Sequence, residues 1–567
     1  MLLWRVVIGL TILWLGVALV LPAARPDWAT PTASAPVWGW DETMHAELPA
    51  VQMLFYAQRG DWHEAMEVVH ECDRYPFGYP LALAAWQGVF GVGQAVARHL
   101  GTVCFFLLVL LAVRLSTQLV RAEQRVDAAL LVGLAAISAP LARRYAPTLF
   151  LEVPALVMIA ASMSAWISRR RCEPRTKGRL WWDLLTGLLI AITFFTKFNY
   201  ALLLGLALFL DAAVELLATT DRRGVLVSMG RSLVPLVVGL LWWFVIPLPF
   251  GAEVAAEHRG DFLEFITGNT EMTMAGWLRL TNWFAGIAPH TFLFFALGIL
   301  SLVLLALQRT RTSVTLAIML AAFVVPIVMH PFQLDRFLLP AGLGLWVLGG
   351  SGAALLLRAS PVLFTASAVG IGIACVKVSV LTTATWVGFP LQEEGTAVRD
   401  FQEYHVGTTI SLFGAPASNG LTAVDHKKLM DMIAEAVGPE DSVGWLGQSS
   451  EISPASLNLA LLERGGSTDR FLENAPGPMD IELLPSNVRS DHSLEELLEY
   501  ARRFDHVIVP AQGDLIGRGG REWVLEAWHQ PLRDWPGAQW RTLGTIVIDR
   551  NILGPLPITF ELLSVPE

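Results

Sequence analysis

Trp38-Gly39-Trp40-Asp41-Glu42-Thr43-Met44-His45-Ala46-Glu47 follows the first apolar segment of the chain, residues 2–23, and many further apolar segments come after it. Its adjacent carboxylates, Asp41 and Glu42, stand just outside what these segments predict to be a bundle of membrane helices. Acidic side chains are costly to place near lipid, so at such a position they more often mark chemistry or transport than packing. The first loop is therefore the first place to look for function.

The composition predicts a polytopic membrane protein with a polar tail. The 567 residues are 54% hydrophobic and 16% charged, whereas soluble domains carry roughly 25% charged residues. Residues 391–567 contain 27 Asp and Glu against 13 Lys and Arg, and a tail of this length can fold by itself. We therefore divide the chain into an all-α membrane domain, residues 1–390, and an acidic α/β domain, residues 391–567.

A spanning helix needs about 20 apolar residues, so the pattern predicts about eleven spans. They are residues 2–23, 100–120, 126–141, 148–168, 182–198, 200–217, 232–250, 285–307, 314–330, 337–357 and 361–388. The first apolar segment reaches full spanning length, which favours an uncleaved anchor over a signal peptide.

Lysine and arginine gather in one set of the predicted loops, which predicts the orientation. Residues 169–179 alone hold five arginines and a lysine. With the N-terminus in the cytoplasm, all such loops lie inside, while residues 24–99 and the acidic tail lie outside. A bacterial inner membrane fits best, although an endoplasmic reticulum membrane would give the same charge pattern.

The first outer loop has helical patterns of its own, over residues 44–58 and 62–72, with a break at Gly60-Asp61. Residues 79–90 are apolar but too short to span, so we expect a helix lying in the plane of the outer leaflet.

The tail alternates helical patterns with short apolar strands, and its patterns predict a small binding or packing module. We expect helices at residues 423–437 and 494–504 and strands at residues 442–446, 506–509 and 545–548. Gly517-Arg518-Gly519-Gly520 lacks the strand and helix that a phosphate-binding loop requires.

The sequence gives little indication of a metal site or a disulfide. The four cysteines fall in separate segments without pairing or metal-ligand spacing. His45, His63, His70 and Glu71 share the first loop and offer ligands for a divalent metal such as Zn²⁺. Because no pair has strong ligand spacing, we expect surface or capping histidines and no required metal, with a divalent ion as the alternative.

Two groups of charged residues are candidates for chemistry at the outer face. Asp41 can act as a general base if an acceptor hydroxyl comes within reach, or it can cap the helix that follows. Cations at outer helix ends oppose the charge bias of the chain, and phosphate is a natural partner for them; they are Arg143, Arg144, Lys197 and Arg336. Reaching to lipid headgroups, or pairing with Glu152 and Asp335, would also account for these cations.

Several motifs together resemble the GT-C class of membrane glycosyltransferases, in particular its protein O-mannosyltransferase and aminoarabinose-transferase branch. The resemblance starts at Asp41-Glu42 and covers residues 1–350 loosely, while the tail matches nothing we can name. The other motifs, in order, are Arg59-Gly60-Asp61-Trp62, Tyr75-Pro76-Phe77-Gly78-Tyr79-Pro80-Leu81, Arg144-Tyr145, Thr196-Lys197 and Asp335-Arg336-Phe337-Leu338-Leu339-Pro340.

This resemblance implies a GT-C-like fold and transfer of a sugar from a polyprenyl phosphate to an acceptor hydroxyl, with inversion at the anomeric carbon. Asp41 would be the base, with Glu42 and Glu152 as positioning groups. The donor phosphate would lie among Arg144, Tyr145, Lys197 and Arg336. The partners implied are the lipid donor, membrane lipids and a protein, lipid or glycan acceptor, with no nucleic acid.

Two other functions remain open from the residues alone. A transporter or flippase of lipid-linked sugars would favour charges buried in mid-span and an internal repeat, and no convincing repeat is visible. A membrane scaffold or sensor that binds a partner through its acidic tail would leave the polar first loop without a role. The sequence does not identify the sugar or the acceptor.

Overall fold

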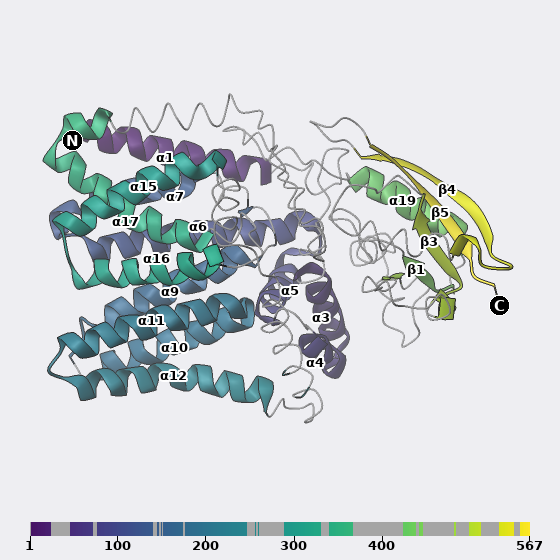
Figure 1. Ribbon diagram of the computed structural model, residues 1–567, viewed down its shortest axis with the longest axis horizontal. Coiled ribbons are helices and arrows are strands. Elements are labelled where there is room, and N and C mark those ends of the chain that lie inside the picture. The colour runs from purple at the N-terminus through teal and green to yellow at the C-terminus, as the bar shows by residue number, and fades with distance from the viewer. Residues whose placement is uncertain are drawn as a thin grey trace, which may run out of the picture.

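The structure is a computed structural model in which a helical bundle is joined to a smaller α/β domain (Figure 1). It describes residues 2–23, 46–71, 76–139, 145–146, 149, 151–173, 176–245, 256, 259, 288–329, 339–366, 423–437, 441–445, 481–483, 498–499, 501–511, 532–548 and 556–566. Within these ranges the strands all lie beyond residue 440.

Long helices make up the bundle. They are α1 (Leu2–Ala23), α6 (Gln94–Leu119), α7 (Arg125–Ser138), α9 (Glu152–Arg169), α10 (Lys177–Thr196), α11 (Phe198–Ala218), α12 (Arg222–Phe244), α15 (Ala288–Leu307), α16 (Arg311–Met329) and α17 (Leu339–Ala359), with the short turn η3 (Ala122–Gln124) before α7. By length and composition, 5 helices among the described residues can cross a membrane.

Each predicted span from residues 2–23 to residues 337–357 overlaps one of these helices. The last predicted span, 361–388, falls mostly outside the described residues. The chain is a polytopic integral membrane protein, and the number of spans stays a prediction.

Helix α12 starts ten residues before the span predicted at 232–250. The apolar window excludes the first turns of this helix because they carry Arg222, Arg223 and Arg231. The helix begins there because Asp221 caps it: the Gly224 N–H donates to Asp221 Oδ1 at 3.0 Å, the bond that an N-cap side chain supplies.

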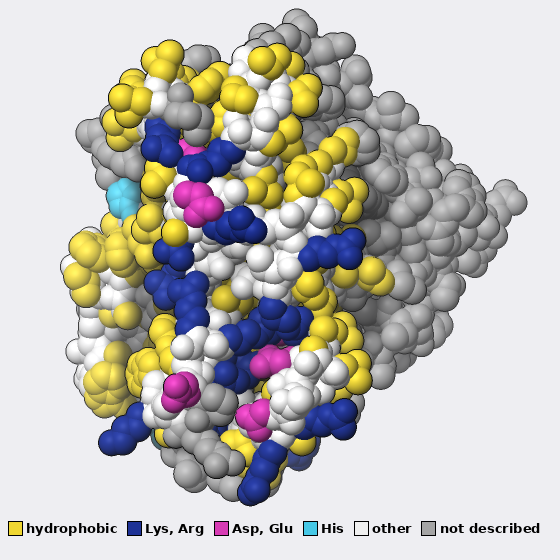
Figure 2. All heavy atoms as spheres, turned by 90° about the vertical axis from the view of Figure 1, so that its left-hand side faces the viewer, with side chains coloured by type: hydrophobic (Ala, Val, Ile, Leu, Met, Phe, Trp, Pro, Cys, Tyr) yellow, Lys and Arg dark blue, Asp and Glu magenta, His cyan; other side chains and the backbone are white. Residues whose placement is uncertain are grey.

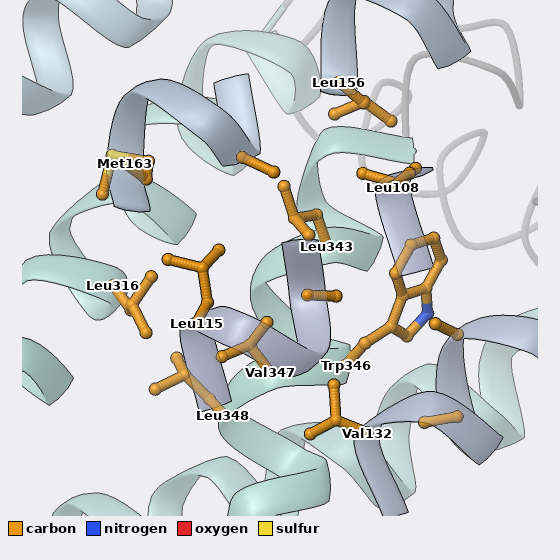
Figure 3. Packing of buried hydrophobic residues seen from close by; sticks show 14 of the residues in the cluster. Leu108, Leu115, Val132, Leu156, Met163, Leu316, Leu343, Trp346, Val347 and Leu348 are labelled. Carbon is orange, nitrogen blue, oxygen red and sulfur yellow. The ribbon is translucent and has the colours of Figure 1, made fainter. Parts of the chain in front are cut away.

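Helix α17 lies in the middle of the main apolar core (Figure 3). Nearly all of its side chains are buried, and Leu343, Trp346, Val347 and Leu348 from this helix pack in one cluster with Leu108, Leu115, Val132, Leu156, Met163 and Leu316. Because α17 is buried on all sides, its sequence is apolar all round, as expected for a central helix.

One end of the bundle carries most of its charge, and we call it the basic end (Figure 2). It is formed by the first turns of α1, α7, α10, α12 and α16 and the last turns of α6, α9, α11, α15 and α17. Lysine and arginine side chains outnumber acidic ones on this face. The loops predicted to be cytoplasmic thus meet on one face, and the positive-inside rule predicts that this face is cytoplasmic.

Buried carboxylates tie the helices together at the basic end. Asp127 of α7 accepts a hydrogen bond from Arg5 Nε at 2.7 Å and one from Arg358 Nη2 at 2.9 Å. Its side chain is 1% exposed. One acid therefore joins α1, α7 and α17, and its charge is balanced by two guanidinium groups.

A second carboxylate, Asp211 of α11, joins three more helices. It accepts from Trp166 Nε1 at 2.7 Å and from Thr315 Oγ1 at 2.8 Å, and it pairs with Arg170 and with Arg311 at 2.7 Å. Helices α9, α11 and α16 meet at this side chain. Buried charges are retained when they are paired and hydrogen-bonded in this way.

The first loop folds as predicted into short helices, α3 (Leu48–Arg59), α4 (Trp62–Glu71) and α5 (Gly78–Phe90). Gly60 has φ of 84° and its N–H donates to Ala57 O; a glycine adopts this left-handed conformation at little cost, which explains the break between α3 and α4. The three helices lie at the end opposite the basic end (Figure 1). We call this the loop end.

The tail contains a mixed sheet of β1 (Val443–Trp445), β2 (Ile481–Leu483), β3 (His506–Pro510), β4 (Gln539–Ile548) and β5 (Leu556–Ser564). The strand order is β2-β1-β3-β5-β4. Strand β1 pairs in parallel with β2 and β3, while β5 pairs antiparallel with β3 and β4. Helix α19 (Ala423–Ala436) packs in one apolar cluster with the sheet, so the tail is an α/β module, as predicted.

The strand predictions were correct for β1, β3 and the end of β4, while β2, β5 and the first part of β4 were not predicted. The predicted helix 423–437 coincides with α19. The turn Gly517-Arg518-Gly519-Gly520 lies outside the described residues.

Candidate active site

A buried ion pair lies at the loop end of the bundle. Lys197 Nζ donates to Glu152 Oε1 at 3.0 Å, and the two side chains are 3% and 1% exposed. Both residues were singled out from the sequence, and the structure brings them into contact. The attraction within such a pair offsets part of the cost of removing both groups from water.

Breaks between helices position both members of the pair. Lys197 is the single residue between α10 and α11, in an extended conformation with φ of −158° and ψ of 94°. Glu152 is in the first turn of α9, where the helix dipole favours a negative charge. The Lys197 ammonium also lies 5.2 Å from the centre of the Tyr200 ring, within the range of a cation–π contact.

Phe77 and Gly78 of the first-loop motif, residues 75–81, pack against Phe195, two residues before Lys197. Gly78, at the start of α5, approaches the backbone of Phe195 so closely that an added Cβ would lie 2.5 Å from the Phe195 carbonyl oxygen. The Phe77 and Phe195 rings are 5.2 Å apart. The first-loop motif therefore lies against the end of α10, next to the Thr196-Lys197 motif, although the two are over a hundred residues apart in the sequence.

An aromatic cluster continues from this contact to α12. The rings of Phe77 and Phe195 contact Trp242 and Trp243. His70 of α4 stacks on Trp243 with the ring centres 5.5 Å apart and the planes 13° apart. Loop helices and membrane helices thus share an aromatic cluster that includes Phe195, two residues before Lys197.

His70 does not follow the expectation of surface or capping histidines, because it is 5% exposed and packed among these rings. On the outer face of α4, the potential ligand atoms of His63, Glu64 and Glu67 lie within 4.8 Å of one another. Helical spacing brings these side chains together. Among the described residues these three are the metal-ligand combination that the chain offers, and His70 is not part of it, while His45 lies outside the described residues.

The remaining predicted site residues divide into two groups. Tyr145 is 6% exposed and belongs to the main core cluster, near the start of α9. Outside the described residues lie Asp41, Glu42, His45, Arg143, Arg144, Asp335 and Arg336.

Sequence reasoning missed two contributors to this site. Tyr200 was overlooked because a tyrosine within an apolar span carries no functional pattern of its own. Gly78 was quoted within its motif, but its role as the contact to Phe195 depends on helix packing. Only its position between aromatic residues, just before a short apolar helix, could have indicated that role.

Comparison with known proteins gives the class of fold. No family model and no curated protein sequence matches the chain. The structure is similar to ArnT from Cupriavidus metallidurans in the apo state, at 15% identity and a TM-score of 0.54 over 98% of this chain and 97% of that one. The same protein bound to undecaprenyl phosphate gives 16% identity and a TM-score of 0.52, with 98% of each chain covered.

The oligosaccharyltransferase AglB from Archaeoglobus fulgidus, in complex with an inhibitory peptide and a dolichol-phosphate, shares the fold too. It is 10% identical, with a TM-score of 0.52 over 95% of this chain and 73% of that one. This chain therefore has the GT-C fold, as its sequence motifs predicted. At these identities the likeness concerns the fold.

Proposed function

We propose that this chain is an inverting glycosyltransferase that moves a sugar from a polyprenyl-phosphate donor to an acceptor hydroxyl at the outer face of the membrane. The supporting observation is that Gly78 of the first-loop motif packs against Phe195, two residues before Lys197, which is paired with Glu152. It occurs in a fold shared, end to end, with an ArnT that binds undecaprenyl phosphate.

In the proposed reaction the acceptor oxygen bonds to the anomeric carbon as the bond from that carbon to the donor phosphate oxygen breaks. Asp41 takes the hydroxyl proton, and Glu42 positions the acceptor. Attack from the face opposite the phosphate inverts the anomeric carbon. The leaving group is a polyprenyl phosphate, whose negative charge Arg144, Lys197 and Arg336 stabilise, since preorganised cations act most strongly where water is excluded.

The role proposed for Lys197 is consistent with its contact to Glu152. A lysine ammonium carries three N–H donors, so a bond to Glu152 is compatible with a bond to a phosphate oxygen. Glu152 would then fix the position of Lys197 and lower the cost of burying it. Tyr145 would stand beside Arg144 at the same site.

The test is sugar transfer from a panel of radiolabelled polyprenyl-phosphate sugars, in membranes that contain the wild type or Asp41→Asn. Loss of a general base should lower the rate by about 10²–10⁴-fold at equal expression. Glu123→Gln, an exposed acid at the basic end, is the matched control and should leave the rate unchanged.

Transfer that persists in Asp41→Asn would remove this residue from the reaction. The proposed transferase activity would be overturned in favour of a flippase if wild-type membranes moved a lipid-linked sugar across the bilayer but transferred the sugar from no donor. Dependence on a divalent ion is tested in the same assay with a chelator, and Glu67→Gln should abolish any such dependence if the group on α4 binds the ion.

A further inference from the structure

Helix α12 lies at the edge of the bundle (Figure 1), and it exposes a stripe of apolar side chains. Val227, Val234, Val238 and Leu241 are 43–60% exposed. They recur at intervals of three, four and seven residues and so share one face of the helix. In a membrane this face contacts lipid chains.

Arg231 interrupts this stripe, four residues after Val227 and three before Val234. Its side chain is 33% exposed, and within the described residues its ion pair is a single long one, from Nη1 to Asp183 Oδ2 at 4.0 Å. Asp183 already accepts from Ser228 and lies 3.6 Å from Arg179 Nε. The positive charge of Arg231 is thus only weakly balanced by an acidic partner, on a face turned toward lipid, where an unbalanced charge is costly.

The surroundings of Arg231 combine further positive charge with apolar surface. Helices α10 and α12 both start at the basic end and pack closely, with Gly187 against the Ser232 backbone. Toward the basic end from Arg231, the exposed cationic side chains are Lys177, Arg222 and Arg223, with the exposed Asp221 beside them. Trp181 of α10 is 62% exposed, as is common for tryptophan at a membrane interface.

We propose that this surface of α10 and α12 binds an anionic glycerophospholipid of the leaflet at the basic end, independently of any glycosyltransferase activity. The phosphate pairs with Arg231, because a guanidinium group matches phosphate with two parallel hydrogen bonds. The negative headgroup reaches toward Lys177 and Arg223. The acyl chains lie along Val234 and Val238, and this apolar stripe favours a lipid over a soluble anion.

Native mass spectrometry of the full-length protein in detergent tests this surface. The probes are phosphatidylglycerol and phosphatidylcholine, added to the wild type, to Arg231→Gln and to Arg125→Gln. Arg125 is exposed at the basic end on α7, away from α12 (Figure 1), and serves as the matched control. Wild type and Arg125→Gln should bind phosphatidylglycerol about tenfold more tightly than Arg231→Gln does, as expected for loss of one charged hydrogen-bonding contact.

Equal affinity of wild type and Arg231→Gln for phosphatidylglycerol would overturn the proposal. So would equal affinity of the wild type for the two lipids, a measurement that needs no variant. If Arg231→Gln does not fold, Arg231→Lys is the second variant, because it keeps the charge but lacks the planar guanidinium group with its paired N–H donors. It should bind phosphatidylglycerol more weakly than wild type. A dimer that forms through α12 and excludes the lipid would also contradict it.

Discussion

The two ends of the bundle bury charge in different ways. At the basic end, Asp127 and Asp211 each accept from several donors and each joins three helices. At the loop end, Lys197, between α10 and α11, pairs with Glu152 of α9, and an aromatic cluster shared with the first loop includes the nearby Phe195. The comparison indicates that the charges of the basic end hold the bundle together, whereas those of the loop end lie where we propose that the donor binds.

The largest expected effect is loss of the loop-end pair. Lys197→Met leaves Glu152 buried without its cation and should cost about 3–5 kcal/mol of stability. Adding Glu152→Leu should recover most of that loss, because an apolar pair of similar volume is often as stable as a buried ion pair. Thermal unfolding measures the stability, and the transfer assay measures function.

The double variant separates the two roles of the pair. If the pair serves the reaction, Lys197→Met/Glu152→Leu stays inactive although it is stable. Recovery of transfer along with stability would assign the pair to folding alone and remove the contrast between the two ends.

At the basic end, Asp211→Asn should lower stability by about 3 kcal/mol, because Arg170 and Arg311 lose a buried carboxylate. The transfer rate per folded molecule should stay at the wild-type value, as expected for a structural charge. Unfolding curves and transfer assays on the same preparations test both statements. A fall in the rate of the folded protein would show that the basic end also affects the reaction.

A smaller effect is expected for Gly78→Ala. The new methyl group would meet the Phe195 backbone at 2.5 Å, and overpacking of this kind costs about 1–3 kcal/mol. Displacement of α5 should also slow transfer. Gly205→Ala on α11 is the matched control, since nothing lies within 4 Å of its added Cβ; equal rates for the two variants would show that the contact of α5 with α10 is unimportant.

The smallest effect concerns the tail. The Ser442 N–H and hydroxyl donate to Asp505 Oδ2 at 2.7 and 2.8 Å, and these hydrogen bonds lower the pKa of Asp505. A carboxylate whose pKa is lowered by folding adds stability that is complete above its unfolded pKa, about 3.9. That stability is lost as the pH falls through the folded pKa.

Ser442→Ala removes one of the two hydrogen bonds to Asp505. The stability that this carboxylate contributes should then be lost at a higher pH than in the wild type. The change should be under about 1 kcal/mol because the site is exposed. Hydrogen exchange of peptides covering β1 and β3, followed from neutral to acidic pH in the full-length protein, measures it. Identical profiles for wild type and variant would mean that Asp505 does not contribute to the pH dependence.

Sequence patterns located the elements well where one physical signal dominates. Apolar length gave helices at nearly all predicted spans, and Gly60 marked the break between α3 and α4. The pattern failed at the start of α12, where three arginines lie within the helix, and at β2, where three residues are too few to show a period. Local composition does not reveal a helix turn or a strand that depends on distant partners.

The sequence by itself determined the class of protein: apolar segments long enough to span, basic loops gathered on one side, and ordered polar motifs over residues 1–350. These properties depend on the free energy of transferring each residue between water and lipid, and these free energies add along the chain. Tertiary structure alone decided which motifs meet. The contact of Gly78 with Phe195, the pairing of Lys197 with Glu152 and the sharing of Asp211 among three helices depend on how the helices pack. Packing is set by the complementarity of whole surfaces, which no local stretch of sequence specifies.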